Sequence, residues 1–515
     1  MREPGQLAHR KGEHGQVSAT NIGKSSTPTD GRGEHRSAGA DAGRGLGAPG
    51  SIWWLVLVAV AFITAELAFV GTHPTLAWDE VVYVSQVSRH APASPFVPAR
   101  ARGVSLLVAP VTLLTSSVAV LRVYLSVLSG LALFGALLVW RRLRATWILA
   151  LVGLLFGSLW IVQYYGLRAM PNLWFALSGF TAVGFFLRAV AKLGRNQPDT
   201  GQAWGELTGL AACLAFAALM RPGDAVFLAI PLAGAVLLVD SWRRWQLLAT
   251  VAVGVVSGVA EWAIEAYVRY GGPFSALHSA TAMQGGYGLH LGMWIELRAL
   301  DGPVICRRHC TVGWEHPQLT IWWLALPALV AFGLVAARRA GRLGSAALAA
   351  VCGFSVALQY LFLIGYAAPR FLIPTYLLFA VPVADGLAWL LTGLHGPLRV
   401  LAGAVVAVVL LAQVVSQHRI LRQEVTAPDN GYGHVAADLH HLGVRPPCLV
   451  KGMQYIPIAF YAGCASAASL PGSGLAVRVA VIGHAGAPPP AYLQGWGRYR
   501  LPGSRLVAYL PNTRP

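Results

Sequence analysis

The sequence predicts an all-α polytopic membrane bundle of about eleven transmembrane helices, followed by a small α/β domain. Of its 515 residues, 56% are hydrophobic and only 12% are charged, whereas soluble globular proteins carry roughly a quarter charged residues. Apolar runs of about 20 residues, the length that crosses a bilayer core about 30 Å thick, recur along the chain. The segment 417–515 contains no such run and is richer in proline, glycine and polar residues.

The first element is a tail, residues 1–50, which consists of glycine, serine, histidine and charged residues with almost no large apolar side chains. Such a composition buries too little apolar surface to fold, so we expect a disordered cytoplasmic tail. The apolar run that follows has the length of a full span. The long tail before it therefore favours an uncleaved first helix over a cleavable signal peptide.

The transmembrane domain is predicted to cover residues 51–416. The expected spans are 52–71, 118–140, 146–163, 171–190, 204–220, 224–240, 246–266, 320–337, 345–365, 371–392 and 398–416. The stretch 103–117 is apolar but short, and it contains Pro110. We expect a juxtamembrane or re-entrant helix there, because a further span would reverse the orientation of all those after it.

The net charge of +18 does not indicate a nucleic-acid-binding protein, because the sequence has no basic stripe interleaved with aromatic residues. The arginines lie in short clusters between apolar runs, as the positive-inside rule produces. These clusters are at 141–144, 188–195, 243–244 and 338–342. With a cytoplasmic N-terminus they all face the cytoplasm, so we expect an integral plasma membrane protein whose loops 72–117 and 267–319 and whose C-terminal domain are extracytoplasmic.

The C-terminal domain, residues 417–515, is predicted to be α/β. The pattern of 432–443 indicates a helix that ends at a glycine suited to a C-cap. The stretches 447–452 and 477–483 are typical of short buried strands. The run 455–463 between them is expected to form a second helix.

The cysteines agree with this topology. Cys213 and Cys352 lie in predicted spans, whereas the other four lie outside, where disulfides persist. The economical pairings are Cys306 with Cys310 and Cys448 with Cys464, although sequence alone leaves the connectivity open. The stretch 306–310, CRRHC, together with His316 is an alternative metal site, but no second spaced pair completes a zinc set.

Two adjacent carboxylates, Asp79 and Glu80, follow the first span in the stretch 73-HPTLAWDEVVY-83. Like charges beside a low-dielectric region repel each other and raise at least one pKa. One interpretation is structural, with Asp79 as a helix N-cap and Glu80 in the first turn. The other is chemical, because a carboxylate at the membrane interface can act as a general base on a hydroxyl group.

The arrangement of span, W78-D79-E80-V-V-Y83 and many further spans resembles the GT-C glycosyltransferases, which include the protein O-mannosyltransferases and the aminoarabinose transferases. Three further stretches resemble passages of that family. They are 168-RAMPNLWFALSGFTAVGFFLRA-189, 220-MRPGDAVFLAIPL-232 and 366-YAAPRFLIPTYLLFAVPVADGL-387. The resemblance covers roughly residues 52–416, and an outer C-terminal domain is also common in the family.

The resemblance implies transfer of a sugar, with inversion, from a polyprenyl-phosphate donor to a hydroxyl of a glycan, lipid or protein acceptor on the extracytoplasmic side. It implies Asp79 as the general base and Arg370 as the ligand of the donor phosphate, the alternative for Arg370 being an interfacial arginine. Glu80 would orient Asp79, bind a sugar hydroxyl or bind a cation. Further candidates for substrate contact are Tyr83, for which packing is the alternative, and His290. Arg122, near the start of a span, is most simply an interfacial anchor, with contact to the donor as the alternative.

One departure concerns the loop after the third span, where several relatives carry a second acidic residue. This chain has Arg168, Met170 and Asn172 there, so a divalent cation bridging two loops stays an open question. Three other functions stay open. They are a lipid or solute transporter or flippase, a polysaccharide polymerase or ligase of the same superfamily, and a non-catalytic subunit with the same fold.

Overall fold

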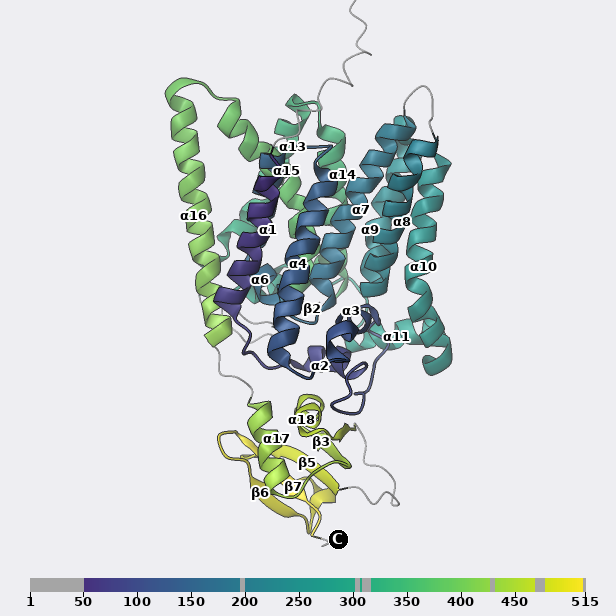
Figure 1. The fold of residues 1–515 in the computed structure, drawn as a ribbon, viewed down its shortest axis with the longest axis vertical. Coiled ribbons are helices and arrows are strands. Elements are labelled where there is room, and N and C mark those ends of the chain that lie inside the picture. The colour runs from purple at the N-terminus through teal and green to yellow at the C-terminus, as the bar shows by residue number, and fades with distance from the viewer. Residues whose placement is uncertain are drawn as a thin grey trace, which may run out of the picture. The chain divides into compact units, whose positions relative to one another are not determined.

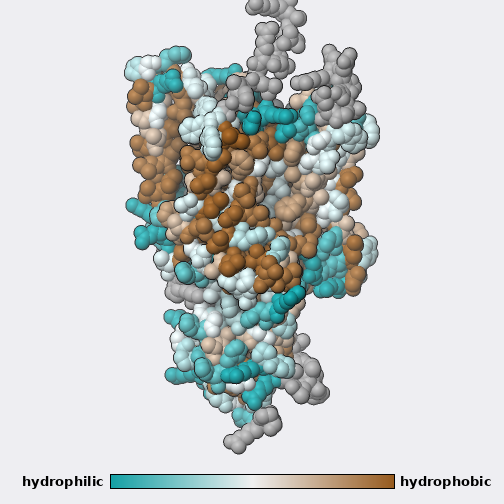
Figure 2. Space-filling view, viewed as in Figure 1, coloured by the Kyte–Doolittle hydropathy of each residue, from teal (hydrophilic) through white to brown (hydrophobic). Residues whose placement is uncertain are grey.

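Most of the described chain is a bundle of apolar helices, drawn from purple to green in Figure 1. The computed structural model describes residues 51–194, 200–301, 306–307, 316–426, 431–467 and 478–512. The predicted disordered tail, residues 1–50, lies outside the described residues. On the face in view, Figure 2 shows hydrophobic side chains gathered over the middle of the bundle and hydrophilic ones toward its two ends.

Within the described residues, nine helical segments are long and apolar enough to cross a membrane, and they coincide with nine of the eleven predicted spans. The first, sixth, seventh and eighth of these segments each include a neighbouring short helix. The segments are α1 (Trp53–Ala65) with its π-helical extension η2 (Glu66–Val70), α4 (Val118–Trp140), α7 (Pro171–Leu193), α8 (Thr200–Met220), α10 (Trp245–Tyr270), α13 (Ile321–Arg339) with η4 (Pro317–Leu319), α14 (Leu343–Leu358) with η5 (Gln359–Leu363), η6 (Pro369–Leu372) with α15 (Ile373–Thr392), and α16 (Gly396–Thr426).

The two remaining predicted spans have other forms. The first is a pair of helices, α5 (Thr146–Gly157) and α6 (Trp160–Gly166), bent by 82°. Side-chain amides satisfy backbone groups at the break, since Gln163 donates to the carbonyl of Gly157 at 3.0 Å and Gln417 accepts from the N–H of Trp160 at 3.0 Å. Broken helices inside a membrane protein need such partners. The second is α9 (Pro222–Leu238), which has only 17 residues.

Local chemistry sets several helix boundaries. The side chain of Ser117 accepts a hydrogen bond from the N–H of Val120 and so caps α4. Proline is tolerated in the first turn of a helix because its missing N–H has no partner there, and α7 begins at Pro171. Gly271 ends α10 with φ +75°, a left-handed conformation that favours glycine.

The loops at one end of the bundle carry short helices. They are α2 (Trp78–Ser85), α3 (Gly103–Thr112), α11 (Pro273–Met283) and α12 (Met293–Ala299). The short helix predicted within 103–117 is therefore present, as α3. At 1.5 Å per residue, α4 is about 34 Å long, so the arginine cluster 141–144 lies at the opposite end of the bundle from α3 (Figure 1).

The C-terminal domain contains a five-stranded sheet of order β4-β3-β5-β7-β6. The central pair, β3 and β5, is parallel, and β7 is antiparallel to both β5 and β6. The elements are α17 (Tyr432–His441), β3 (Cys448–Gly452), α18 (Tyr455–Ala462), β4 (Ala465–Ser466), β5 (Arg478–His484), β6 (Gly497–Arg500) and β7 (Leu506–Leu510). The predicted helices and strands of this domain are confirmed, whereas β4, β6 and β7 were not predicted.

One predicted disulfide, Cys448–Cys464, is confirmed and joins the start of β3 to the residue before β4. The predicted pairing of Cys306 with Cys310 lies outside the described residues. A short two-stranded sheet pairs β1 (Cys306–Arg307) with β2 (Tyr366–Ala367). Cys213 and Cys352 are free, as expected for cysteines inside spans.

Candidate active site

The helix that carries the acid pair, α2, begins at Trp78, because the carboxylate of Glu80 accepts a hydrogen bond from the backbone N–H of Ala77 at 3.0 Å. Asp79 is therefore inside the first turn, and the structural interpretation that made it the N-cap is wrong. Successive helical residues point about 100° apart. The two adjacent carboxylates consequently face different surroundings.

Glu80 is completely buried and surrounded by donors. Its carboxylate pairs with Arg122 and lies 3.3 Å from Nη1 of Arg168, and it accepts the backbone N–H of Ala169 at 2.8 Å. Burial would raise the pKa of Glu80, but the guanidinium groups of Arg122 and Arg168 outweigh it and lower the pKa to about 2. Glu80 is thus an ionised anchor, and both of its oxygens are already occupied by donors.

Arg122 is equally buried, so the expectation of an interfacial anchor is wrong. Its Nη1 donates to the carbonyl of Leu167 at 3.0 Å, and its Nη2 donates to that of Thr75 at 3.2 Å. The residue lies near the start of α4 and is 0% exposed. It joins α4, the loop before α2 and the loop before α7 around the carboxylate of Glu80.

Asp79 is the accessible acid of the pair, with a quarter of its side chain exposed. Its Oδ1 lies 2.6 Å from Nη2 of Arg100, and its Oδ2 lies 3.1 Å from Nη2 of Arg370. Burial raises the pKa of Asp79, but the two guanidinium groups together hold it below the ordinary value of an aspartate. Asp79 is therefore ionised at neutral pH.

Arg370 lies in η6, directly before α15, and its side chain is only 7% exposed. It contacts the hydroxyl of Tyr165 at 3.3 Å as well as Asp79. The guanidinium also lies over the ring of Phe371, 5.2 Å from its centroid. The alternative of an interfacial arginine is wrong, because the guanidinium of Arg370 is buried beside Asp79, which lies 291 residues earlier in the sequence.

The other candidates have different positions. Tyr83 is almost completely buried below Arg100, whose guanidinium lies 5.3 Å from the ring centroid, and it packs edge-on against Phe96. The backbone N–H of His290 donates to the carbonyl of Phe362 at 2.8 Å. In the described part of the chain, no hydrogen bond or ion pair joins the ring of His290 to Asp79 or Arg370.

Sequence reasoning missed Arg100 as a partner of Asp79 and Arg168 as a partner of Glu80. A usable signal existed for Arg100, since 100-RAR-102 places two arginines in a loop predicted to be outside, against the positive-inside rule. Arg102 forms an ion pair with Glu265 of α10 at 2.6 Å and so fastens this loop. A basic residue on the wrong side of the topology indicates an acidic partner nearby.

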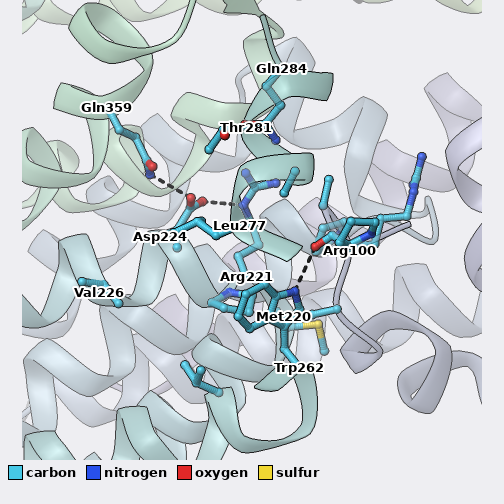
Figure 3. A pocket seen from close by; sticks show the side chains of 18 of the residues that line it. Arg100, Met220, Arg221, Asp224, Val226, Trp262, Leu277, Thr281, Gln284 and Gln359 are labelled. Atoms are coloured by element: carbon cyan, nitrogen blue, oxygen red, sulfur yellow. Dashed lines mark hydrogen bonds and ion pairs between the residues drawn. The ribbon is translucent and has the colours of Figure 1, made fainter. Parts of the chain in front are cut away.

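A cavity of about 330 Å³ opens beside Arg100 and Tyr83. Its walls come mainly from α9, α10, α11 and η5, and most of them are apolar. The polar part is a cluster in which Arg221 pairs with Asp224, and Gln359 donates to Asp224 at 2.8 Å (Figure 3). Arg221 therefore lies in a wall of this cavity.

A second hollow, an apolar groove of about 600 Å³, lies between α13, α14 and α15. We call it the α13–α15 groove. Its lining includes Leu372 and Tyr376, which follow Arg370 by two and six residues, and Met293 at the start of α12. The cavity beside Arg100 and the α13–α15 groove thus approach the two cations that hold Asp79.

Comparison with solved structures identifies the architecture. ArnT from Cupriavidus metallidurans, bound to undecaprenyl phosphate, superimposes with a TM-score of 0.62 over 89% of this chain and 98% of that chain, at 12% sequence identity. The Archaeoglobus fulgidus oligosaccharyltransferase tethered to an acceptor peptide gives a TM-score of 0.52 over 90% and 74% of the two chains, at 13% identity. This chain has the GT-C fold. The sequence matches no family model and no curated protein.

Within this GT-C fold, the residues at the acid pair do not fit a divalent cation. Both oxygens of Asp79 are paired with arginines, and Glu80 faces Arg122 and Arg168. Metal ions such as Mg²⁺ and Mn²⁺ bind carboxylate, carbonyl or water oxygens. Here the carboxylate oxygens are occupied by cationic guanidinium groups, which would repel a metal ion. Among the described residues, no group of three or more His, Cys, Asp or Glu side chains is placed to hold a metal.

Proposed function

We propose that this chain is a membrane glycosyltransferase that moves a sugar from a polyprenyl-phosphate donor to a hydroxyl group of a glycan, lipid or protein acceptor. The observation that carries the proposal is the pair of Asp79 and Arg370, which meet at 3.1 Å although 291 residues separate them. A carboxylate that takes a proton from a hydroxyl and a guanidinium that binds a phosphate are the two groups that such a transfer needs.

The proposed reaction is a single displacement. The acceptor oxygen attacks the anomeric carbon from the face opposite the phosphate, and the bond from that carbon to the phosphate oxygen breaks. Its electron pair leaves with the polyprenyl phosphate, whose charge Arg370 stabilises. The proton of the acceptor passes to Asp79, and the configuration of the sugar inverts.

The low pKa of Asp79 makes it a weak proton acceptor while both arginines hold it. A phosphate competes with a carboxylate for the same bidentate guanidinium geometry. When the donor phosphate binds Arg370, Asp79 loses one of the two cations that lower its pKa. Donor binding therefore makes the base stronger at the moment when it is needed.

The two hollows suggest places for the two substrates. The α13–α15 groove is apolar, lies among three helices long enough to cross a membrane and is lined by Leu372, two residues after Arg370, so it suits the polyprenyl chain. The cavity beside Arg100 combines apolar walls with the Arg221–Asp224–Gln359 cluster, which suits a hydroxyl-bearing acceptor. Asp79 is held by Arg100, which lines that cavity, and by Arg370, two residues before Leu372 of the groove, so we place it between the two substrates.

The extracytoplasmic side is supported by the disulfide. Cys448–Cys464 belongs to the domain whose helix α18 packs against α2, and the hydroxyl of Tyr461 accepts the N–H of Leu76 at 2.8 Å. Disulfides persist outside the cytoplasm. The acid pair and the disulfide consequently belong on the same, outer side, and the arginine clusters on the inner side.

The test is a transfer assay in membranes or proteoliposomes with a panel of sugars linked to undecaprenyl phosphate and labelled on the sugar. Asp79→Asn is expected to lower the rate by about 10²–10⁴-fold, the usual loss of a general base. The matched control is Asp240→Asn, at an exposed position in the loop after α9, which is expected to leave the rate unchanged. Wild-type rates in a folded Asp79→Asn protein, or no transfer from any polyprenyl-phosphate sugar, would contradict the proposal.

A further inference from the structure

The outer loop between α10 and α13 is fastened to the segment that leads into Arg370. The backbone N–H groups of Gly288 and Gly292 donate to the carbonyls of Leu363 and Leu361 at 3.1 and 2.8 Å. A Cβ at Gly292 would lie 2.6 Å from the carbonyl oxygen of Tyr360, so the close approach requires glycine there. Helix α12 begins at the next residue and is thereby held beside η5 and β2.

This attachment buries an acid that the reaction described above does not use. Glu296 of α12 is 0% exposed, and neither carboxyl oxygen has a hydrogen-bond partner of normal geometry within the described chain. A buried carboxyl without partners is costly. Such groups in native structures call for a specific explanation.

The position of Glu296 points to the phosphate site. The backbone N–H of Ala368, two residues before Arg370, and the guanidinium of Arg370 are the groups that favour its charged form. The hydroxyl of Tyr376, in the wall of the α13–α15 groove, is close enough to respond to its charge. Glu296 therefore lies near both Arg370 and Tyr376, and among the described residues Nε of Arg370 is itself buried without a hydrogen-bond partner.

Burial dominates the ionisation of Glu296 and raises its pKa to about 8, since Ala368 and Arg370 offset it only in part. At neutral pH the side chain is consequently a carboxylic acid with an O–H to donate. The elements packed against α12 or contributing charge carry few other ionisable groups. These are Tyr360 of η5, Tyr366 of β2, Arg370 of η6, Tyr376 of α15, Arg298 and Asp301 beside Glu296 itself, and Cys306 and Arg307 of β1, whose side chains lie outside the described residues.

We propose that Glu296 is a second ligand of the substrate phosphate, a neutral carboxylic acid that donates a hydrogen bond to a phosphate oxygen while Arg370 binds the same group. This proposal rests on the proposed function. An O–H donor to an anionic oxygen forms one of the shorter and stronger hydrogen bonds. It also gives the site a dependence on pH, because ionised Glu296 would repel the phosphate and compete for Arg370.

The experiment measures binding of undecaprenyl phosphate to the full chain in detergent, with undecaprenol as the ligand that lacks the phosphate. The affinity of the wild type for undecaprenyl phosphate is expected to fall as pH rises through about 8, at least tenfold between pH 7 and 9.5. The phosphate itself titrates near pH 6 and does not contribute in that range. Binding of undecaprenol is expected to be independent of pH.

Three variants separate the outcomes. Glu296→Gln keeps a neutral donor of the same size, so it is expected to bind at pH 7 within about threefold of the wild type and to lose the fall above pH 8. Glu296→Ala removes the hydrogen bond and is expected to weaken binding about tenfold or more at pH 7. Glu261→Gln, at a partly exposed glutamate of α10, is the matched control and should keep the wild-type profile.

A wild-type profile in Glu296→Gln would overturn the role of Glu296 and leave the proposed function intact. Equal affinity of the wild type for undecaprenyl phosphate and undecaprenol would instead contradict the proposed donor class itself.

Discussion

The ion pair between Glu80 and Arg122 is predicted to be the main structural support of the candidate site. Both side chains are 0% exposed, and together they join α2, α4 and the loop before α7. Removing one member of a buried pair leaves the other charge uncompensated and costs about 3–5 kcal/mol. Glu80→Met and Arg122→Met are each expected to lower the free energy of unfolding by about that amount.

The double variant distinguishes this explanation from simple loss of packing. Without either charge no uncompensated ion is left, so the combined loss is expected to be at least 2 kcal/mol smaller than the sum of the two single losses. The carbonyls of Leu167 and Thr75 lose a donor in both Arg122 variants, which is why full recovery is not expected. The assay is denaturant unfolding of the protein in mixed micelles. Additive losses would refute the reasoning.

The ion pair between Glu80 and Arg122 also makes the free energy of unfolding depend on pH. The pKa of Glu80 in the folded chain is about 2, below its value of about 4.5 in the unfolded chain, so its contribution to stability is complete above pH 4.5. It is lost as pH falls from 4.5 toward 2. A shift of this size corresponds to about 3 kcal/mol. The wild type is therefore expected to lose stability over this range, and the double variant to lose less.

The other predictions concern single positions. Cys448→Ser is expected to destabilise the C-terminal domain by about 3 kcal/mol, since the disulfide Cys448–Cys464 closes a loop with a sequence separation of 16 residues. In thermal unfolding, a reducing agent should destabilise the wild type but not the variant. Gly166→Ala is expected to cost about 1–3 kcal/mol or to prevent folding, because an added Cβ would lie 1.5 Å from Oε1 of Glu66. Gly135→Ala, with nothing within 4 Å of its Cβ, is the control and should be neutral or stabilising.

Sequence alone predicted much of the bundle, because apolar length and arginine clusters reflect the bilayer directly. The break between α5 and α6 was not predictable in this way. It depends on Gln417, which lies more than 250 residues away and accepts the N–H of Trp160. The edge strand β6 was missed because its mostly exposed stretch, Gly497–Arg500, carries arginines and a tyrosine rather than an apolar pattern.

The candidate site, like the fold, was predicted only in part from the sequence. Asp79 stood out because two adjacent acids are unusual in a chain with few charges. The distinct environments of the two carboxylates were not visible in sequence, since Arg122 and Arg168 surround Glu80 whereas Arg100 and Arg370 hold Asp79. These contacts join the acid pair to four other parts of the chain, and no local pattern records them.

The most direct test of the account is an experimental structure of the chain with undecaprenyl phosphate bound in a lipid nanodisc. We predict that the phosphate lies within hydrogen-bond distance of Arg370 and that the polyprenyl chain of the ligand follows the α13–α15 groove. We also predict that Asp79 has separated from Arg370. A phosphate bound elsewhere, with the Asp79–Arg370 pair unchanged, would contradict the central claim.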